Sequence, residues 1–88
     1  MSYFDEVIGC YRDLSSRFPA ELDREDSELC LNEGEPESAL TGLLEEAYEN
    51  GSLTEGILDE VEKKFDLPPI GDTVRALRAM MRSNNSAA

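Results

Sequence analysis

Residues 32–48 read NEGEPESALTGLLEEAY, and this stretch contains a helix end, a helix start and the clearest amphipathic segment of the chain. Gly34 suits the left-handed residue that closes a helix, and Pro36 suits the first position of the next helix, where its missing N–H is not needed. The stretch therefore predicts a sharp corner between two helices. Apolar residues then recur with helical spacing, at Ala39, Leu40, Leu43, Leu44, Ala47 and Tyr48.

The helix after this corner has one apolar face and one acidic face. It is expected to run from Pro36 to Asn50, because the Asn-Gly pair that follows is typical of a helix end. At about 100° per residue, its carboxylates fall opposite the apolar stripe or at the edges of the stripe. Those opposite are Glu45 and Glu49, and those at the edges are Glu37 and Glu46.

Upstream of the corner, the sequence predicts two helices. Ser2 and Asp5 have the spacing of a capping box, and the apolar residues that follow predict a helix from Tyr3 to Arg17. Phe18-Pro19 ends this helix, because the residue before a proline is disfavoured in the helical conformation. A weaker and more acidic pattern predicts a short helix over 21–31, on which Ser27 is expected to be an ordinary surface residue.

Downstream of the corner, the sequence predicts two more helices. Residues 52–55 form a second capping box before a helix that ends near Phe65. Two prolines then break the chain before a last helix over 71–82. Because no segment alternates as a strand does, the sequence predicts an all-α fold, a small bundle of four to five short antiparallel helices. We expect a single domain over 1–82 and a disordered tail over 83–88.

The length and composition fit one small domain. The chain has 88 residues, of which 40% are hydrophobic, and their periodic clustering argues against a disordered acidic tail. No run of about eighteen apolar residues is present, and acids stand near the N-terminus where a signal peptide carries basic residues. We therefore expect a cytoplasmic protein.

The charge is strongly negative and unevenly distributed. The formal net charge is −12, and residues 21–62 contain fifteen acids against a single base, Arg24. Residues from 63 onward contain five bases and two acids, so a basic end could stabilise the acidic helices at long range. Such a charge opposes binding to nucleic acid or to an anionic membrane. We expect neither partner, and instead a partner with a basic surface.

Several kinds of site chemistry are excluded by residue type. The chain has no histidine, which removes the commonest general base and metal ligand at neutral pH. Cys10 and Cys30 lack the spacing of a zinc or redox motif, and we expect both to be reduced and partly buried. The sequence therefore predicts no enzyme activity, no metal and no cofactor.

Several soft features between Tyr11 and Leu67 occur together in one known class of protein. The chain resembles the small acidic immunity proteins of bacterial polymorphic-toxin and contact-dependent inhibition systems, particularly the MafI type. The resemblance implies a cytosolic antidote that binds a cognate toxin domain, often a nuclease. After a first helix and a short acidic helix, the features are Asn32-Glu33-Gly34-Glu35, Ala39-Leu40, Leu43, Tyr48-Glu49-Asn50, Leu53-Thr54 and Phe65-Asp66-Leu67.

A basic toxin domain is also the partner that the residues themselves indicate. A nuclease carries a basic groove for phosphates, and a rigid array of carboxylates can occupy that groove. We expect the chain to bind as a monomer, with Tyr48 as an aromatic anchor. The acids expected to bind the toxin are Asp23, Glu25, Asp26, Glu33, Glu35, Glu37, Glu45 and Glu49.

Two other functions remain open from the sequence. Asp26-Ser27 partly matches the modified serine of an acyl or peptidyl carrier protein, although Glu28 stands where such proteins have leucine. Alternatively, the chain could be an acidic adaptor or secretion chaperone that dimerises through the apolar stripe over 70–81.

Overall fold

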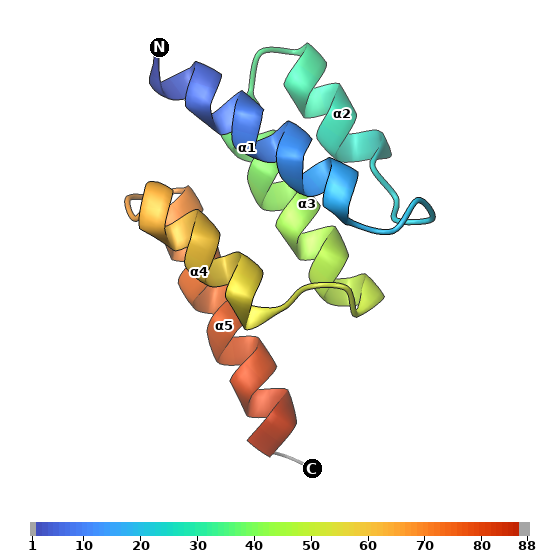
Figure 1. Cartoon of the computed structure of the whole chain (residues 1–88), viewed down its shortest axis with the longest axis vertical. Helices are drawn as coiled ribbons and strands as arrows, with labels where there is room; N and C mark the ends of the chain where they lie inside the picture. The colour runs from blue at the N-terminus through green and yellow to red at the C-terminus, as the bar shows by residue number, and fades with distance from the viewer. Residues whose placement is uncertain (1, 87–88) are drawn as a thin grey trace. The chain divides into compact units, whose positions relative to one another are not determined.

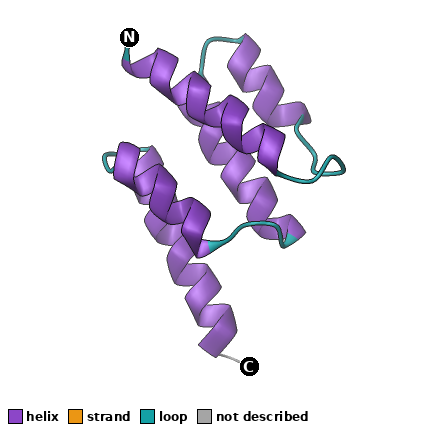
Figure 2. Cartoon of the chain, in the orientation of Figure 1, coloured by secondary structure: helices purple, strands orange, loops and turns teal. Residues whose placement is uncertain are grey.

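The computed structural model describes residues 2–86, with their side chains through Asn84. Within this range the chain forms five helices and no strand, so the all-α prediction is confirmed (Figures 1 and 2). None of these helices combines the length and apolar character needed to cross a bilayer. The helices are α1 (Tyr3–Arg17), α2 (Glu25–Asn32), α3 (Pro36–Asn50), α4 (Glu55–Lys64) and α5 (Ile70–Ser86).

The helices group into two compact units. Residues up to Leu53 form unit 1, in which α1 and α2 each pack against α3 (Figure 1). Residues from Thr54 onward form unit 2, in which α4 packs against α5. That residues 1–82 form a single domain stays a prediction.

The structure confirms the bounds predicted for α1 and α3. At the start of α1, the Ser2 Oγ accepts the N–H of Asp5 at 3.2 Å. Before α3, Gly34 has a φ of +79°, and Pro36 is the first residue of the helix. The left-handed Gly51, with a φ of +83°, closes α3. These turns exist because glycine reaches positive φ without a steric penalty.

The apolar stripe of α3 lies at the centre of unit 1. Leu40, Leu43 and Leu44 have no exposed surface. The side chains of α1 that turn inward, including Tyr11 and Leu14, are also buried. Burying each such side chain contributes about 1.5–3 kcal/mol, so this contact holds the unit together. Cys10 is buried, Cys30 is partly buried, and neither takes part in a disulfide.

The prediction for α2 is wrong at its start. The helix begins at Glu25 and not at residue 21, because the preceding chain turns tightly, with the N–H of Leu22 donating to the carbonyl of Pro19 at 3.1 Å. Leu29 lies on this helix but is 55% exposed. The buried residue of α2 is Ser27. Polar contacts therefore contribute much of what holds this helix in place.

Arg24 makes the first of these polar contacts. Ser15 near the end of α1 lacks the usual intrahelical donor for its carbonyl, because residue 19 is a proline without an N–H. The Arg24 guanidinium supplies it, donating to the Ser15 carbonyl at 2.7 Å and to the Ser15 hydroxyl at 2.8 Å. It also donates to the carbonyls of Leu22 and Phe18, at 2.9 and 3.2 Å. The one base among the fifteen acids thus joins α1 to the start of α2.

Ser27 makes the second contact, and the prediction that it lies on the surface is wrong. Its side chain is 3% exposed. Its hydroxyl lies 3.0 Å from that of Tyr11 and donates to the Arg24 carbonyl at 3.2 Å. The Tyr11 hydroxyl donates in turn to Glu28 at 2.7 Å. Burial and the neighbouring Glu28 carboxylate raise the pKa of Tyr11, so this hydroxyl remains a donor at neutral pH.

The two helices of unit 2 begin at other residues than those that the sequence predicts. The N-cap of α4 is Thr54, which accepts the N–H of Ile57 at 3.1 Å, and not Ser52. Ser52 belongs instead to the end of α3, where its N–H donates to the Ala47 carbonyl at 2.8 Å and its hydroxyl donates to the Oδ1 of Asn50. Helix α5 begins at Ile70 and extends through Ser86, beyond the predicted end at 82. The last two residues of the predicted tail lie outside the described residues.

Arginines join α5 to α4 within unit 2. Arg78 contacts Asp59 at 2.6 Å and Glu62 at 2.7 Å, and these carboxylates raise its pKa. Arg82 contacts Glu55 at 2.8 Å. The apolar stripe of α5, which includes Ile70, Val74 and Leu77, is buried within the chain.

Candidate protein-binding site

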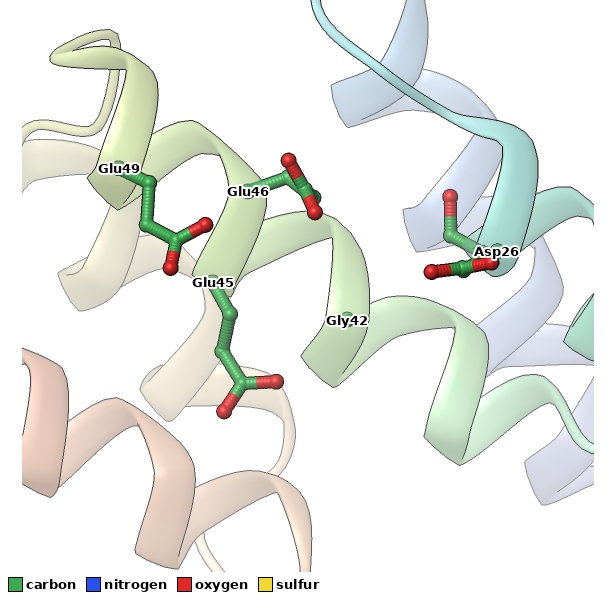
Figure 3. Close-up of a pocket in the computed structure, with 6 residues that line it drawn as sticks. Asp26, Gly42, Glu45, Glu46 and Glu49 are labelled. Atoms are coloured by element: carbon green, nitrogen blue, oxygen red, sulfur yellow. The ribbon is translucent and has the colours of Figure 1, made fainter.

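An acidic groove runs between α2 and α3 in unit 1, with a volume of about 380 Å³ (Figure 3). Four of its lining residues are carboxylates, and none is basic. Helix α3 supplies three of the carboxylates and α2 supplies the fourth. The six residues that define the acidic groove are Asp26, Ser27, Gly42, Glu45, Glu46 and Glu49.

The helical register of α3 positions its side of the groove. Residues 42, 45, 46 and 49 stand at spacings of three, four and seven, which places them on one helix face. Gly42 has no side chain, and a Cβ built there would lie 4.0 Å from the Cβ of Ser27. Helix α2 therefore passes close over α3 at this point. Asp26 reaches the groove because its neighbours Arg24 and Ser27 attach α2 to α1.

The carboxylates of the groove repel one another. Partial burial raises the pKa of Glu46, and the negative charges of Glu49, Asp23, Asp26 and Glu45 raise it further. This arrangement does not stabilise the fold at neutral pH, because a carboxylate with a raised pKa is held ionised at a cost. A cation placed in the groove would remove the repulsion.

The chemistry of the groove suits binding of cations carried by a protein. Ionised carboxylates accept strong, short hydrogen bonds from arginine and lysine. Among the described residues, no three cysteine, aspartate or glutamate side chains are placed to hold a metal ion. The groove also offers no nucleophile that is both exposed and activated, since the Ser27 hydroxyl is buried and hydrogen-bonded.

The structure brings together four of the nine residues predicted to bind a toxin. Asp26, Glu45 and Glu49 line the groove, and Asp23 acts on Glu46 through its charge. Asp23 also accepts the N–H of Glu25 at 2.9 Å, which attaches the first turn of α2. Glu25 is exposed on that turn, outside the lining of the groove.

The other predicted residues lie elsewhere in unit 1. Glu33 and Glu35 are exposed at the corner between α2 and α3. Glu37 is partly buried and accepts a hydrogen bond from the Tyr3 hydroxyl at 2.6 Å. Tyr48, the predicted anchor, is partly buried on α3 and is not among the residues that line the groove.

Glu46 is the groove residue that the sequence prediction left out. It was placed at the edge of the apolar stripe, and the structure confirms that it is partly buried. Two patterns in the sequence pointed to it. A glycine at position 42 inside a strongly periodic helix indicates a close approach by another element. A carboxylate four residues further on, on the same face, then lies beside that element.

Nearly all of the net charge belongs to unit 1. That unit has fourteen acidic and three basic residues, a net charge of −11, whereas unit 2 has six and five, a net charge of −1. The three arginines of α5 contact carboxylates of their own unit at 3.7 Å or less. The sequence suggested that this basic charge would act on the acidic helices. The arginines instead pair with carboxylates of unit 2 itself.

Comparison of the chain with protein-family models, with curated proteins and with solved structures finds no match.

Proposed function

We propose that this chain is an immunity protein, which binds a toxin domain with a basic surface and neutralises it through the acidic groove. The observation that carries the proposal is the groove itself, which is lined by Asp26, Glu45, Glu46 and Glu49 with no base among them. The resemblance to small acidic immunity proteins supports the same function.

Electrostatics explains why a toxin, and a nuclease in particular, would be the partner. A nuclease binds the phosphates of its substrate with lysines and arginines. Carboxylates fixed on α2 and α3 present oxygens that those same cations can bind. The groove would then occupy the basic site and exclude the nucleic acid. The proposed protein acts in the cytoplasm, stoichiometrically, as a monomer and without a cofactor.

The concentration of charge in unit 1 also favours rapid capture. A surface with a net charge of −11 attracts a basic domain from a distance. Such steering raises association rates by about 10–10³-fold, and salt suppresses the effect. Rapid association is what an antidote requires, because the toxin acts as soon as it is free.

Two observations weigh against the alternative functions. A carrier protein needs an accessible serine, whereas Ser27 is 3% exposed and its hydroxyl is hydrogen-bonded to its neighbours. An adaptor that dimerises through α5 needs an exposed apolar stripe, whereas Ile70, Val74 and Leu77 are at most 4% exposed within the single chain.

Co-expression with the toxin tests the proposal. The candidate toxin would be a basic C-terminal domain encoded by a large reading frame upstream of this chain's own gene. We expect this domain to stop growth when produced alone, and co-expression of the wild-type chain to restore growth. The double variant E45K/E49K should fail to restore growth although it remains folded, as shown by its circular dichroism.

A charge-matched variant controls for the loss of negative charge. The double variant E60K/D66K changes the net charge by the same amount in unit 2, and we expect it to protect cells. The proposal would be overturned if the wild-type chain gave no protection. If E45K/E49K protected as well as the wild type, the groove would not be the binding site.

A further inference from the structure

The first turn of α1 exposes two neighbouring aromatic side chains. Tyr3 is 44% exposed and Phe4 is 52% exposed. The centroids of their rings lie 5.6 Å apart, with the planes inclined at 47°. Single exposed apolar residues are common on protein surfaces. An exposed pair of rings in mutual contact is a more specific feature.

A hydrogen bond to α3 holds the Tyr3 side chain of this pair. The Tyr3 hydroxyl donates to the Oε2 of Glu37 at 2.6 Å, across 34 residues of sequence. Burial of the hydroxyl, with the hydrogen bond and charge of Glu37, raises the pKa of Tyr3 to about 12. The hydroxyl therefore stays protonated, and the hydrogen bond persists over the physiological pH range.

The surroundings of the pair are acidic. Asp5 and Glu6 are exposed in the same turn of α1, and Glu37 adds a third carboxylate at the hydroxyl of Tyr3. This turn therefore favours binding to a partner surface that is positively charged. Because the Tyr3 ring is already held by its hydrogen bond, binding requires little further ordering of the patch.

We infer that Tyr3, Phe4 and Glu37 form an aromatic patch that binds an arginine side chain of a basic protein partner. A planar guanidinium can stack on the exposed ring of Phe4 while it donates to a carboxylate, which a compact ammonium cannot do as well. The inference rests on the proposed function for its biological role, and it makes Phe4, instead of Tyr48, the aromatic anchor. The aromatic patch is separate from the acidic groove, since none of its residues lines that groove.

Titration with short peptides tests the aromatic patch without requiring the toxin. The full chain, labelled with ¹⁵N and ¹³C, would be titrated with a capped glycine peptide that carries two arginines. Matched peptides would carry two lysines or two neutral citrullines. We expect the arginine peptide to shift the ring and amide signals of Tyr3 and Phe4, the lysine peptide to shift them less, and the citrulline peptide to leave them unchanged.

Paired variants distinguish specific binding at the patch from the nonspecific electrostatic attraction of a basic peptide to an acidic protein. Replacing Phe4 by alanine should weaken peptide binding at the patch about two- to five-fold, whereas L29A, which removes a similarly exposed side chain, should not weaken it. E37Q should weaken binding at the patch, whereas E21Q removes one exposed charge outside both the patch and the groove and should not. The inference would be overturned if F4A and L29A behaved alike, or if the peptide shifted only the signals of the groove. Growth protection by the wild-type chain is measured in a separate experiment, so a failure of the proposed function can be distinguished from a failure of the aromatic patch to bind arginine.

Discussion

Replacement of Arg24 by glutamine should strongly destabilise unit 1. Three of the hydrogen bonds that Arg24 donates are 2.9 Å or shorter, to the Ser15 hydroxyl, the Ser15 carbonyl and the Leu22 carbonyl. A hydrogen bond from a charged donor contributes about 1.5–3 kcal/mol when it is buried. The Arg24 side chain is only partly buried, so about 1 kcal/mol for each bond is appropriate. The free energy of unfolding should therefore fall by about 2–4 kcal/mol.

The tyrosines of the chain provide a measurement that is specific to unit 1. The sequence has no tryptophan, and its three tyrosines, at positions 3, 11 and 48, all belong to unit 1. Urea unfolding followed by tyrosine fluorescence therefore reports the stability of the unit that contains Arg24.

A second arginine variant controls for the change in charge. Arg17 pairs with Asp13 at 3.2 Å, and both side chains are well exposed. The variant R17Q makes the same change in net charge, but it should cost about 0.5 kcal/mol or less, as for an exposed ion pair. If R24Q and R17Q lowered the stability equally, Arg24 would not be what attaches α2 to α1.

Three further predictions concern the groove and unit 2. E46Q should raise the stability of unit 1 at pH 7 but not at pH 4. The pKa of Glu46 is raised in the folded chain, so the stability of the wild type falls as the pH rises from the ordinary pKa of a carboxyl group through the raised pKa. Urea unfolding followed by tyrosine fluorescence at both pH values checks this. R78Q should lower the free energy of unfolding by about 1–3 kcal/mol, because Glu62 is left with a weaker partner. Thermal unfolding followed by circular dichroism should show that this loss of stability is smaller in high salt than in low salt. G71A should destabilise the chain by about 2–3 kcal/mol, because a Cβ at Gly71 would overlap the backbone of Asp66. In the same thermal melts, G56A should be neutral or stabilising, since its Cβ makes only an ordinary contact.

Local sequence patterns were sufficient to predict α1 and α3. Both helices combine a strong apolar period with residues of special backbone geometry at their ends, such as Gly34 and Pro36. These determinants act within a few residues, so they can be recognised without knowledge of the rest of the chain. The acidic face of α3 followed from the same period.

The start of α2 could not be predicted in this way, because contacts distant in the sequence determine it. Arg24 resembles any surface arginine until the carbonyl of Ser15 is known to need a donor. Ser27 resembles a surface serine until Tyr11 is known to lie 3.0 Å away. The composition of the acidic groove depends on this placement of α2. The sequence alone therefore predicts the acids at the corner, and not Glu46, as binding residues.

The most direct test of the central claim compares two triple variants for binding to the upstream-encoded toxin domain by calorimetry. E45Q/E46Q/E49Q neutralises the acidic groove, and E21Q/E60Q/D66N removes the same number of charges elsewhere. Three interfacial ion pairs at about 1 kcal/mol each correspond to about a 100-fold loss of affinity. We predict that loss for the groove variant and a change of about three-fold or less for the other. Equal losses for both variants would show that the toxin responds only to the total charge, and would contradict the account.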